Sequence, residues 1–396
     1  MGESPSTLRL IMPEVYLGDT PESQEQRTVD IQKCMNTYGD SALDKPRRAL
    51  LLVERTALGR TRHGIMLAVD LEEYDFKVGS SSKVRATEKT IEARLPPRVA
   101  IRQDAIYELP HILVLVDDPD KTIVEPLVQQ AKDGGLAPVY NFDLMKNGGS
   151  LKSWEVADKH LTKVIAALEK NYSKQEFTKR YGSDAESKPP MLFGVGDGNH
   201  SLASAKAFWN QLKEKGAGMD HPARHALIEI NNVHDEGLIF EPIHRLVFDV
   251  PDVDACFTHM ETFLNDAGEG ASFAEKVPEG FSGHVIECFH ESKKFFLVEK
   301  PSRVLAVATL QAALDSYMKT LGEDTKCEID FIHGTEAIEA NTGKTHPQNV
   351  GFTVPAMDKN HLFKTVVFDG VLPRKTFSMG EADEKRFYCE LRKITQ

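Results

Sequence analysis

The chain has 396 residues, which predicts two domains, or three, at roughly 100–200 residues per domain. Apolar residues make up 41% and charged residues 27%, as is typical of a globular protein that buries a core. The net charge of -12 argues against a global attraction to DNA, RNA or an anionic membrane. No apolar run approaches the roughly 20 residues of a membrane-spanning helix.

The five cysteines are widely spaced and odd in number, which favours reduced thiols over a disulfide framework or a Cys-x-x-Cys metal site. The N-terminus lacks the basic region and apolar run of a secretory signal. We therefore expect a soluble cytoplasmic protein without nucleic-acid or membrane partners.

In the first half, apolar runs, turn residues and helix start signals predict elements in the following order. These are a strand over 8–16, a helix from 20–22 to Gly39, strands over 49–53 and 65–69 around a basic turn at 59–64, a strongly basic stretch at 80–102, a strand over 112–116, and helices over 121–133, 156–168 and 169–182.

The second half begins with a strand over 191–193, a glycine-rich loop and a helix over 201–215. Further elements are strands over 226–230 and 238–247, a helix over 252–264, a glycine-rich connection at 268–283, strands over 285–289 and 295–299, and a helix over 309–321. Strands and helices are interleaved without clean alternation, so an α+β (mixed α/β) fold is expected. The expected domains are a catalytic core over 1–250, carrying a phosphate-binding loop, and a C-terminal domain over 251–396.

The segment 194–201, Gly-Val-Gly-Asp-Gly-Asn-His-Ser, links the predicted strand at 191–193 to the helix after it. Glycines allow a ligand to approach the backbone, and the helix N-terminus favours an anion. Asp197 and His200 could hold a metal or move a proton. The spacing is neither a dinucleotide fingerprint nor a Walker loop. Taken alone, a tight turn capped by Asp197 or Asn199 is the better interpretation.

The basic stretch around 85–102 is a second candidate, because arginine can grip a phosphate through two hydrogen bonds. Glu88 and Glu92 lie within it, and either could act as a general base for a hydroxyl. The alternative is a solvated helix face with each glutamate paired to a neighbouring cation.

Three shorter segments are weaker candidates. His244-Arg245 lies on a predicted strand, the turn at 373–377 is cationic, and Asp117-Asp118 could bind Mg²⁺ at the end of a strand. Each has a structural alternative. The sequence contains no nucleophile elbow, zinc motif, protein-kinase motif set or Walker loop.

Taken together, several segments resemble one family, long described as a domain of unknown function. That family looks related to the ParB/sulfiredoxin-like kinases, and some members are free-serine kinases that use pyrophosphate as phosphoryl donor. The matching stretches are 6–17, 85–102, 108–112, 195–205, 243–245 and 372–381. The resemblance implies a ParB/sulfiredoxin-like core with an additional C-terminal α/β domain.

The resemblance also implies roles for individual residues. Glu88 lies in a His-Glu-x-Thr-like motif that includes Thr90, and would deprotonate the serine hydroxyl. Asp197 and His200 match the first and fourth positions of an Asp-Gly-His-His-Arg motif, and would lie at the transferring phosphoryl group. His244 and Arg245 match a Thr-His-Arg motif. Lys375 and Thr376 match a Lys-Ser-Thr-like motif that closes the site. The family's His-His-Arg is Asn199-His200-Ser201 here, and serine cannot supply the arginine charge.

The sequence thus leads to the hypothesis of a phosphotransferase acting from pyrophosphate on free L-serine, with Glu88, Asp197 and His200 as catalytic residues. Mg²⁺ would bind Asp197, with Asp117. The expected substrate-binding and phosphate-binding residues are Arg85, Thr90, Arg94, Arg98, Gly198, Asn199, Ser201, His244, Arg245, Lys375 and Thr376. The alternatives are a nucleotide-dependent kinase of another small hydroxy compound, a phospho-ligand-binding or regulatory protein without turnover, and phosphatase chemistry. A homo-oligomer is left open.

Overall fold

The computed structural model describes residues 5–39, 43, 48–109, 111–322, 324–380 and 389–395. The fold is mixed α/β, as expected. The chain divides into two compact units, one formed by Met1–Leu238 with Ala382–Gln396 and the other by Ile239–Glu381. The boundary expected after residue 250 differs from this division. The reason is that the strand Phe240–Phe248 pairs with strands of the second unit, so the chain leaves the first unit before this strand.

The first unit is built on a nine-stranded sheet of order β3-β4-β9-β6-β10-β2-β1-β8-β7. Its strands are β1 (Leu51–Ala57), β2 (Arg60–Asp70), β3 (Tyr74–Asp75), β4 (Val84–Ala86), β6 (Leu113–Val116), β7 (Ala137–Asp143), β8 (Ser150–Glu155), β9 (Phe193–Asp197) and β10 (His225–Asn232). A separate two-stranded ladder joins β5 (Tyr107–Glu108) to β18 (Arg392–Lys393). The residues expected to form a basic turn at 60–64 belong to β2.

The α-helices of this unit are α1 (Pro21–Gly39), α2 (Leu95–Gln103), α3 (Glu125–Lys132), α4 (Asp158–Tyr172), α5 (Lys174–Tyr181) and α6 (Asn199–Glu214). Short 3₁₀ helices are η1 (Thr7–Leu10), η2 (Glu14–Gly18), η3 (Leu71–Glu73), η4 (Glu92–Arg94), η5 (Ser183–Ser187) and η6 (Pro222–Arg224).

The strand expected over 8–16 is wrong, because η1 and η2 form there. Ser6 caps η1 by accepting the Leu8 N–H, and Pro13, which has no N–H to give to a sheet ladder, precedes η2.

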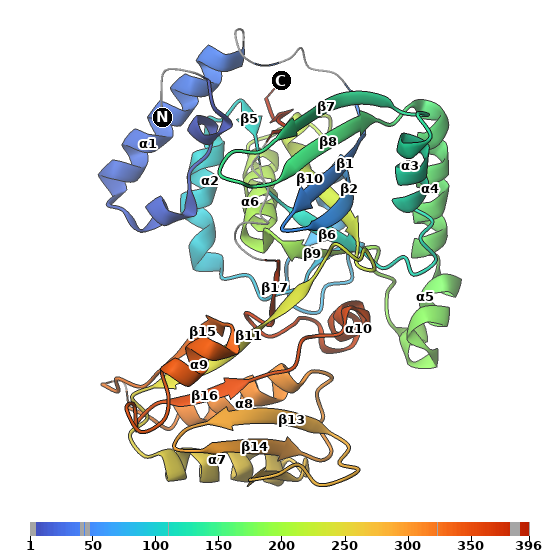
Figure 1. Cartoon of the computed structure of the whole chain (residues 1–396). Coiled ribbons are helices and arrows are strands. Elements are labelled where there is room, and N and C mark those ends of the chain that lie inside the picture. Colours follow the sequence, from blue (N-terminus) through green and yellow to red (C-terminus); the bar gives the residue numbers. More distant parts are fainter. Residues whose placement is uncertain are drawn as a thin grey trace. The chain divides into compact units, whose positions relative to one another are not determined.

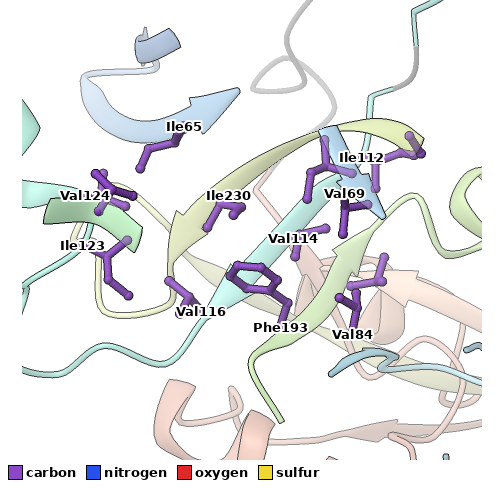
Figure 2. Close-up of a cluster of buried hydrophobic side chains, with 14 of the residues drawn as sticks. Ile65, Val69, Val84, Ile112, Val114, Val116, Ile123, Val124, Phe193 and Ile230 are labelled. Atoms are coloured by element: carbon purple, nitrogen blue, oxygen red, sulfur yellow. The ribbon is translucent and has the colours of Figure 1, made fainter. Parts of the chain in front are cut away.

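The main core lies on one face of the nine-stranded sheet. Side chains of β2, β4, β6, β9 and β10 converge there, among them the labelled Val114, Phe193 and Ile230 (Figure 2). The helices α3, α4 and α6 contribute to the same core, and all three are drawn in green in Figure 1. The helix predicted over 201–215 is confirmed as α6, and its Leu202, Ala205 and Trp209 are fully buried in this cluster.

The second unit contains a seven-stranded sheet of order β12-β14-β13-β16-β11-β15, with β17 also paired to β11. Its strands are β11 (Phe240–Phe248), β12 (Ala271–Ala274), β13 (His284–Phe289), β14 (Lys293–Val298), β15 (Glu328–His333), β16 (Val350–Thr353) and β17 (Phe377–Met379). Its helices are α7 (Val253–Asp266), α8 (Ala306–Met318), α9 (Thr335–Ala340) and α10 (Lys359–Asp369).

The glycine-rich stretch at 268–283 lies inside the second unit and contributes β12, so it does not mark a boundary. All five cysteines are free thiols, as the sequence predicts. Among the described residues, no helix has the length and apolar character needed to cross a membrane.

Candidate active site

The Glu88 segment and the glycine-rich segment at 194–201 meet at the carboxyl ends of two neighbouring strands of the nine-stranded sheet. Strands β4 and β9 are neighbours and run parallel, with Ala86 opposite Val195. Because parallel strands end at the same edge, the chain leaving β4 toward Glu88 and the chain leaving β9 at Asp197 emerge side by side. Glu88 and Asp197 are both half-buried there.

Two hydrogen bonds tie the Glu88 segment to the turn between β9 and α6. The buried Thr87 donates its hydroxyl to the Val195 carbonyl at 2.5 Å. The Ile91 N–H donates to His200 Nε2 at 3.4 Å. Because Nε2 accepts this bond, the proton of a neutral His200 lies on Nδ1, so the ring presents a donor at that nitrogen. Thr87 and Ile91 join the two segments through these hydrogen bonds, and the motif analysis did not single them out.

Gly198 makes the sharp turn that starts α6. Its φ of 87° lies in the left-handed region, where a side chain is strained. A Cβ at this position would lie 2.9 Å from the His111 carbonyl oxygen and 3.1 Å from Ile112 Cα. Asp197 Oδ1 accepts the Gly198 N–H at 2.8 Å, and no side chain caps α6. The expected helix cap is therefore absent, and the N-terminus of this 16-residue helix is suited to an anion.

Two buried polar atoms at this place lack hydrogen-bond partners. Thr90 is 7% exposed and Asn199 is 9% exposed, and neither Thr90 Oγ1 nor Asn199 Oδ1 has a partner among the described residues. Asn199 Nδ2 donates to the Val195 carbonyl at 3.3 Å, which identifies Oδ1 as the unsatisfied acceptor. A buried polar group left unpaired costs about 1–3 kcal/mol. Such a cost is typical of a position where a ligand completes the hydrogen bonding.

The arginines of the basic stretch differ in their surroundings. Arg85 is 5% exposed, and burial lowers the pKa of its guanidinium. It donates to the carbonyls of Ser82 at 2.8 Å, Pro189 at 2.8 Å and Pro190 at 2.9 Å. The side chain expected to bind phosphate thus anchors the segment before β9, because proline carbonyls accept its hydrogen bonds.

Arg94 and Arg98 are more exposed than Arg85. Arg94 is exposed in η4, and the half-buried Arg98 donates to the Arg94 carbonyl at 2.9 Å. Ser201 is half-buried in the first turn of α6, at the place where the family motif has an arginine.

Asp117 lies at the opposite end of the sheet from Asp197. In the antiparallel pair of β6 and β9, Leu113 is opposite Asp197 and Val116 is opposite Phe193. Asp117 follows Val116, so roughly 14 Å separates it from Asp197 at about 3.4 Å per residue. The expected Mg²⁺ site shared by these two carboxylates is therefore wrong.

The carboxylate of Asp117 is instead used within the fold. Its Oδ1 lies 2.7 Å from His234 Nε2, and its Oδ2 accepts the Tyr181 hydroxyl. Burial raises the pKa of Asp117, but these hydrogen bonds and the charge of Arg180 outweigh burial and hold the pKa below its usual value.

In the second unit, His244 and Arg245 lie on β11 and point to opposite faces of its sheet. His244 is 5% exposed, and its Nδ1 accepts the Val354 N–H at 3.3 Å, which places the proton of the neutral ring on Nε2. Burial, together with the nearby charges of Arg245 and His333, lowers its pKa, so His244 is a neutral donor near pH 7.

Arg245 is fully buried and holds the cationic turn at 373–376. It donates to the carbonyls of Lys375 at 2.9 Å and Arg374 at 3.0 Å, and to Gln311 Oε1 at 2.8 Å. Lys375 is exposed and has a left-handed φ of 56°. Thr376 is buried and donates to the Pro373 carbonyl at 2.8 Å. Arg245 therefore shapes the turn that presents Lys375.

Comparison with known proteins places the chain in a family. The family described as a protein of unknown function, DUF1015, matches residues 1–317, so the chain belongs to this family. No curated protein sequence matches the chain.

Three solved structures are similar to the chain at low levels. A free serine kinase in complex with AMP has a TM-score of 0.42 and 11% identity, over 83% of this chain and 91% of that chain. A conserved hypothetical protein from Pyrococcus furiosus has a TM-score of 0.39 and 13% identity, over 83% and 95%. SbnI with a C-terminal truncation, from Staphylococcus aureus, has a TM-score of 0.38 and 11% identity, over 79% and 82%. The function of this chain is therefore inferred from the residues of its own site.

Proposed function

We propose that the protein is a small-molecule kinase that transfers a phosphoryl group from pyrophosphate to the hydroxyl of free L-serine, on a ParB/sulfiredoxin-like core. The proposal rests on one observation. The Glu88 segment is hydrogen-bonded to the turn between β9 and α6, and this place is called the junction below. This junction combines a carboxylate with an uncapped helix N-terminus. Phosphoryl transfer requires little more, because it depends mainly on positioning and charge neutralisation.

In the proposed reaction, Glu88 accepts the proton of the serine hydroxyl as the hydroxyl oxygen bonds to phosphorus. The bridging P–O bond of pyrophosphate breaks, and the products are O-phosphoserine and phosphate. The amides at the start of α6 and His200 Nδ1–H would donate to the transferring phosphoryl oxygens. Arg94 and Arg98 would neutralise phosphate charge.

Mg²⁺ fits this proposal through a single carboxylate. Among the described residues, no group of three or more His, Cys, Asp and Glu side chains could hold a metal. Mg²⁺ is commonly bound by one or two carboxylates together with substrate phosphates, and Asp197 offers one. Asp197 would hold the ion, which would supply charge neutralisation at the phosphates.

The test compares two neighbouring carboxylates. Glu88 lies in the junction, whereas Glu92 is exposed in η4. In an assay of O-phosphoserine formation, Glu88→Gln is expected to lower kcat by about 10²–10⁴-fold, the usual contribution of a general base. The matched control Glu92→Gln is expected to keep turnover within about threefold of wild type, because it leaves the proposed base, Glu88, intact. Full turnover by Glu88→Gln would refute the assignment of the base.

A second candidate function is phospho-ligand binding without turnover. It is favoured by Ser201, which cannot supply the charge of the family's arginine, and by Arg85, whose guanidinium donates to three carbonyls. Calorimetric binding of phosphoserine or pyrophosphate, with no product formed from any donor, would support this function over the kinase.

A further inference from the structure

The connecting segment, residues 233–239, links β10 to β11 and crosses the division between the two units. Several contacts fix it to the first unit. His234 Nε2 lies 2.7 Å from Asp117 Oδ1, and Asp235 Oδ2 accepts the His63 N–H at 3.0 Å. A Cβ on Gly237 would lie 2.0 Å from the Thr61 carbonyl oxygen, so the segment lies directly against the backbone of β2.

The imidazole of His63 lies between two carboxylates from different elements. Its Nε2 is 3.2 Å from Glu54 Oε2, and its Nδ1 is 3.6 Å from Asp235 Oδ2. Glu54 is the cross-strand neighbour of His63 on β1, whereas Asp235 belongs to the connecting segment. Glu54 has a second cationic partner, Lys152 of β8, at 3.0 Å.

This arrangement is suited to a protonated ring. A carboxylate can only accept a hydrogen bond, and a neutral imidazole carries one N–H, whereas the imidazolium carries two. A neutral His63 would therefore direct a lone pair at one of the two carboxylates. When His63 is neutral, Glu54 still has its ion pair with Lys152. The contact between His63 and Asp235 is therefore the one that weakens.

We propose that protonation of His63 latches the connecting segment onto β2, so that this segment is held more tightly to the first unit when His63 is charged. Asp235 makes two further hydrogen bonds that do not depend on the protonation state of the His63 ring. Its carboxylate accepts the backbone N–H groups of His63 and Gly237. The segment consequently loosens without unfolding when His63 loses its proton.

The direction of the pKa agrees with this geometry. Burial lowers the pKa of His63, but the hydrogen bonds and charges of Asp235 and Glu54 outweigh burial and raise the pKa above 6.5. A group whose pKa is raised in the folded state stabilises that state fully below its unfolded pKa, and this stabilisation is lost as pH rises through the folded pKa. The latch is therefore closed on the acidic side of the His63 titration and open on the basic side.

The experiment is amide hydrogen exchange of the connecting segment, measured between about pH 5.5 and 8.5, the range in which histidines titrate. After correction for the intrinsic pH dependence of exchange, the segment is expected to exchange severalfold faster on the basic side. The midpoint should equal the His63 pKa measured by NMR. His63→Gln, which cannot be protonated, should abolish the step, whereas the control His346→Gln, at an exposed histidine of the second unit, should retain it.

A wild-type segment whose exchange has no step, or a step that survives in His63→Gln, would overturn the proposal. A second variant covers the case in which His63→Gln fails to fold. Asp235→Asn removes the charge on the connecting segment, and is expected to lower the His63 pKa and to give fast exchange across the whole pH range. An unchanged His63 titration in Asp235→Asn would equally overturn the latch.

Discussion

At the scale of single residues, the site depends on conformations that only certain side chains allow. Gly198 is the clearest case, because its left-handed φ and its close approach to the His111 carbonyl leave no room for a Cβ. The turn that this glycine permits puts Asp197 before α6 and His200 within it, next to the Glu88 segment.

Gly216 offers a matched control for Gly198 at the other end of the same helix. Its φ of 91° is also left-handed, but a Cβ there would meet nothing within 4 Å. Gly216→Ala is expected to cost about 1 kcal/mol of strain, and Gly198→Ala to cost about 1–3 kcal/mol more because of the added clash. Urea unfolding of both variants measures the difference. Equal losses in the two variants would contradict the packing described around Gly198.

The residues of the site were partly predictable. Asp197 and His200 share a short motif with glycine, which makes them candidates, although the motif taken alone favours a tight turn. The role of Arg85 could not be predicted. Its charge is visible in the sequence, but the carbonyls of Pro189 and Pro190 that accept its hydrogen bonds lie 104 and 105 positions away. The spacing of Thr87 and Val195, 108 positions apart, likewise gives no local signal.

At the scale of elements, the ladder of β5 and β18 brings the end of the chain back to the first unit. Its central group is Glu108, which is fully buried and accepts from Arg102 at 2.6 Å, Arg392 at 2.6 Å and the Leu227 N–H at 2.8 Å. Burial raises the pKa of Glu108, but the two arginines outweigh burial and hold the pKa below its usual value.

Glu108→Gln is expected to lower the free energy of unfolding near pH 7 by about 3 kcal/mol, because it removes the buried counter-charge of two half-buried arginines. A carboxylate with a lowered folded pKa stabilises the fold above its unfolded pKa of about 4.3 and loses this effect as pH falls through the folded pKa. The difference between wild type and variant should therefore shrink below about pH 4. Urea titrations at several pH values measure it, with the exposed Glu186→Gln as control. A difference independent of pH would contradict the buried ion pairs.

Elements with a strong apolar period were predicted well, as α6 and α7 show. The antiparallel pair of β7 and β8 was not predicted, because β7 is an edge strand with mostly exposed residues and no apolar alternation. The segment at 8–16 was assigned to a strand on apolar content alone, although Pro13 and the cap at Ser6 favour the short 3₁₀ helices that form.

At the scale of the whole molecule, the second unit is a continuous stretch inserted into the first, since residues on both sides of it belong to the first unit. A sequence pattern does not reveal such an insertion. The pairing of β11 with β15 and β16 assigns the chain after Leu238 to the second unit, and those partners come about 80 or more residues later in sequence order.

The proposed function requires the junction of Glu88 with the turn between β9 and α6 to transfer a phosphoryl group to free serine. The most direct measurement is phosphorus NMR of the purified protein with Mg²⁺, L-serine and pyrophosphate, with ATP and ADP as parallel donors. We expect a phosphoserine signal from pyrophosphate that is absent in Glu88→Gln. A folded wild-type protein that forms no phosphoserine from any donor would refute the kinase and favour phospho-ligand binding.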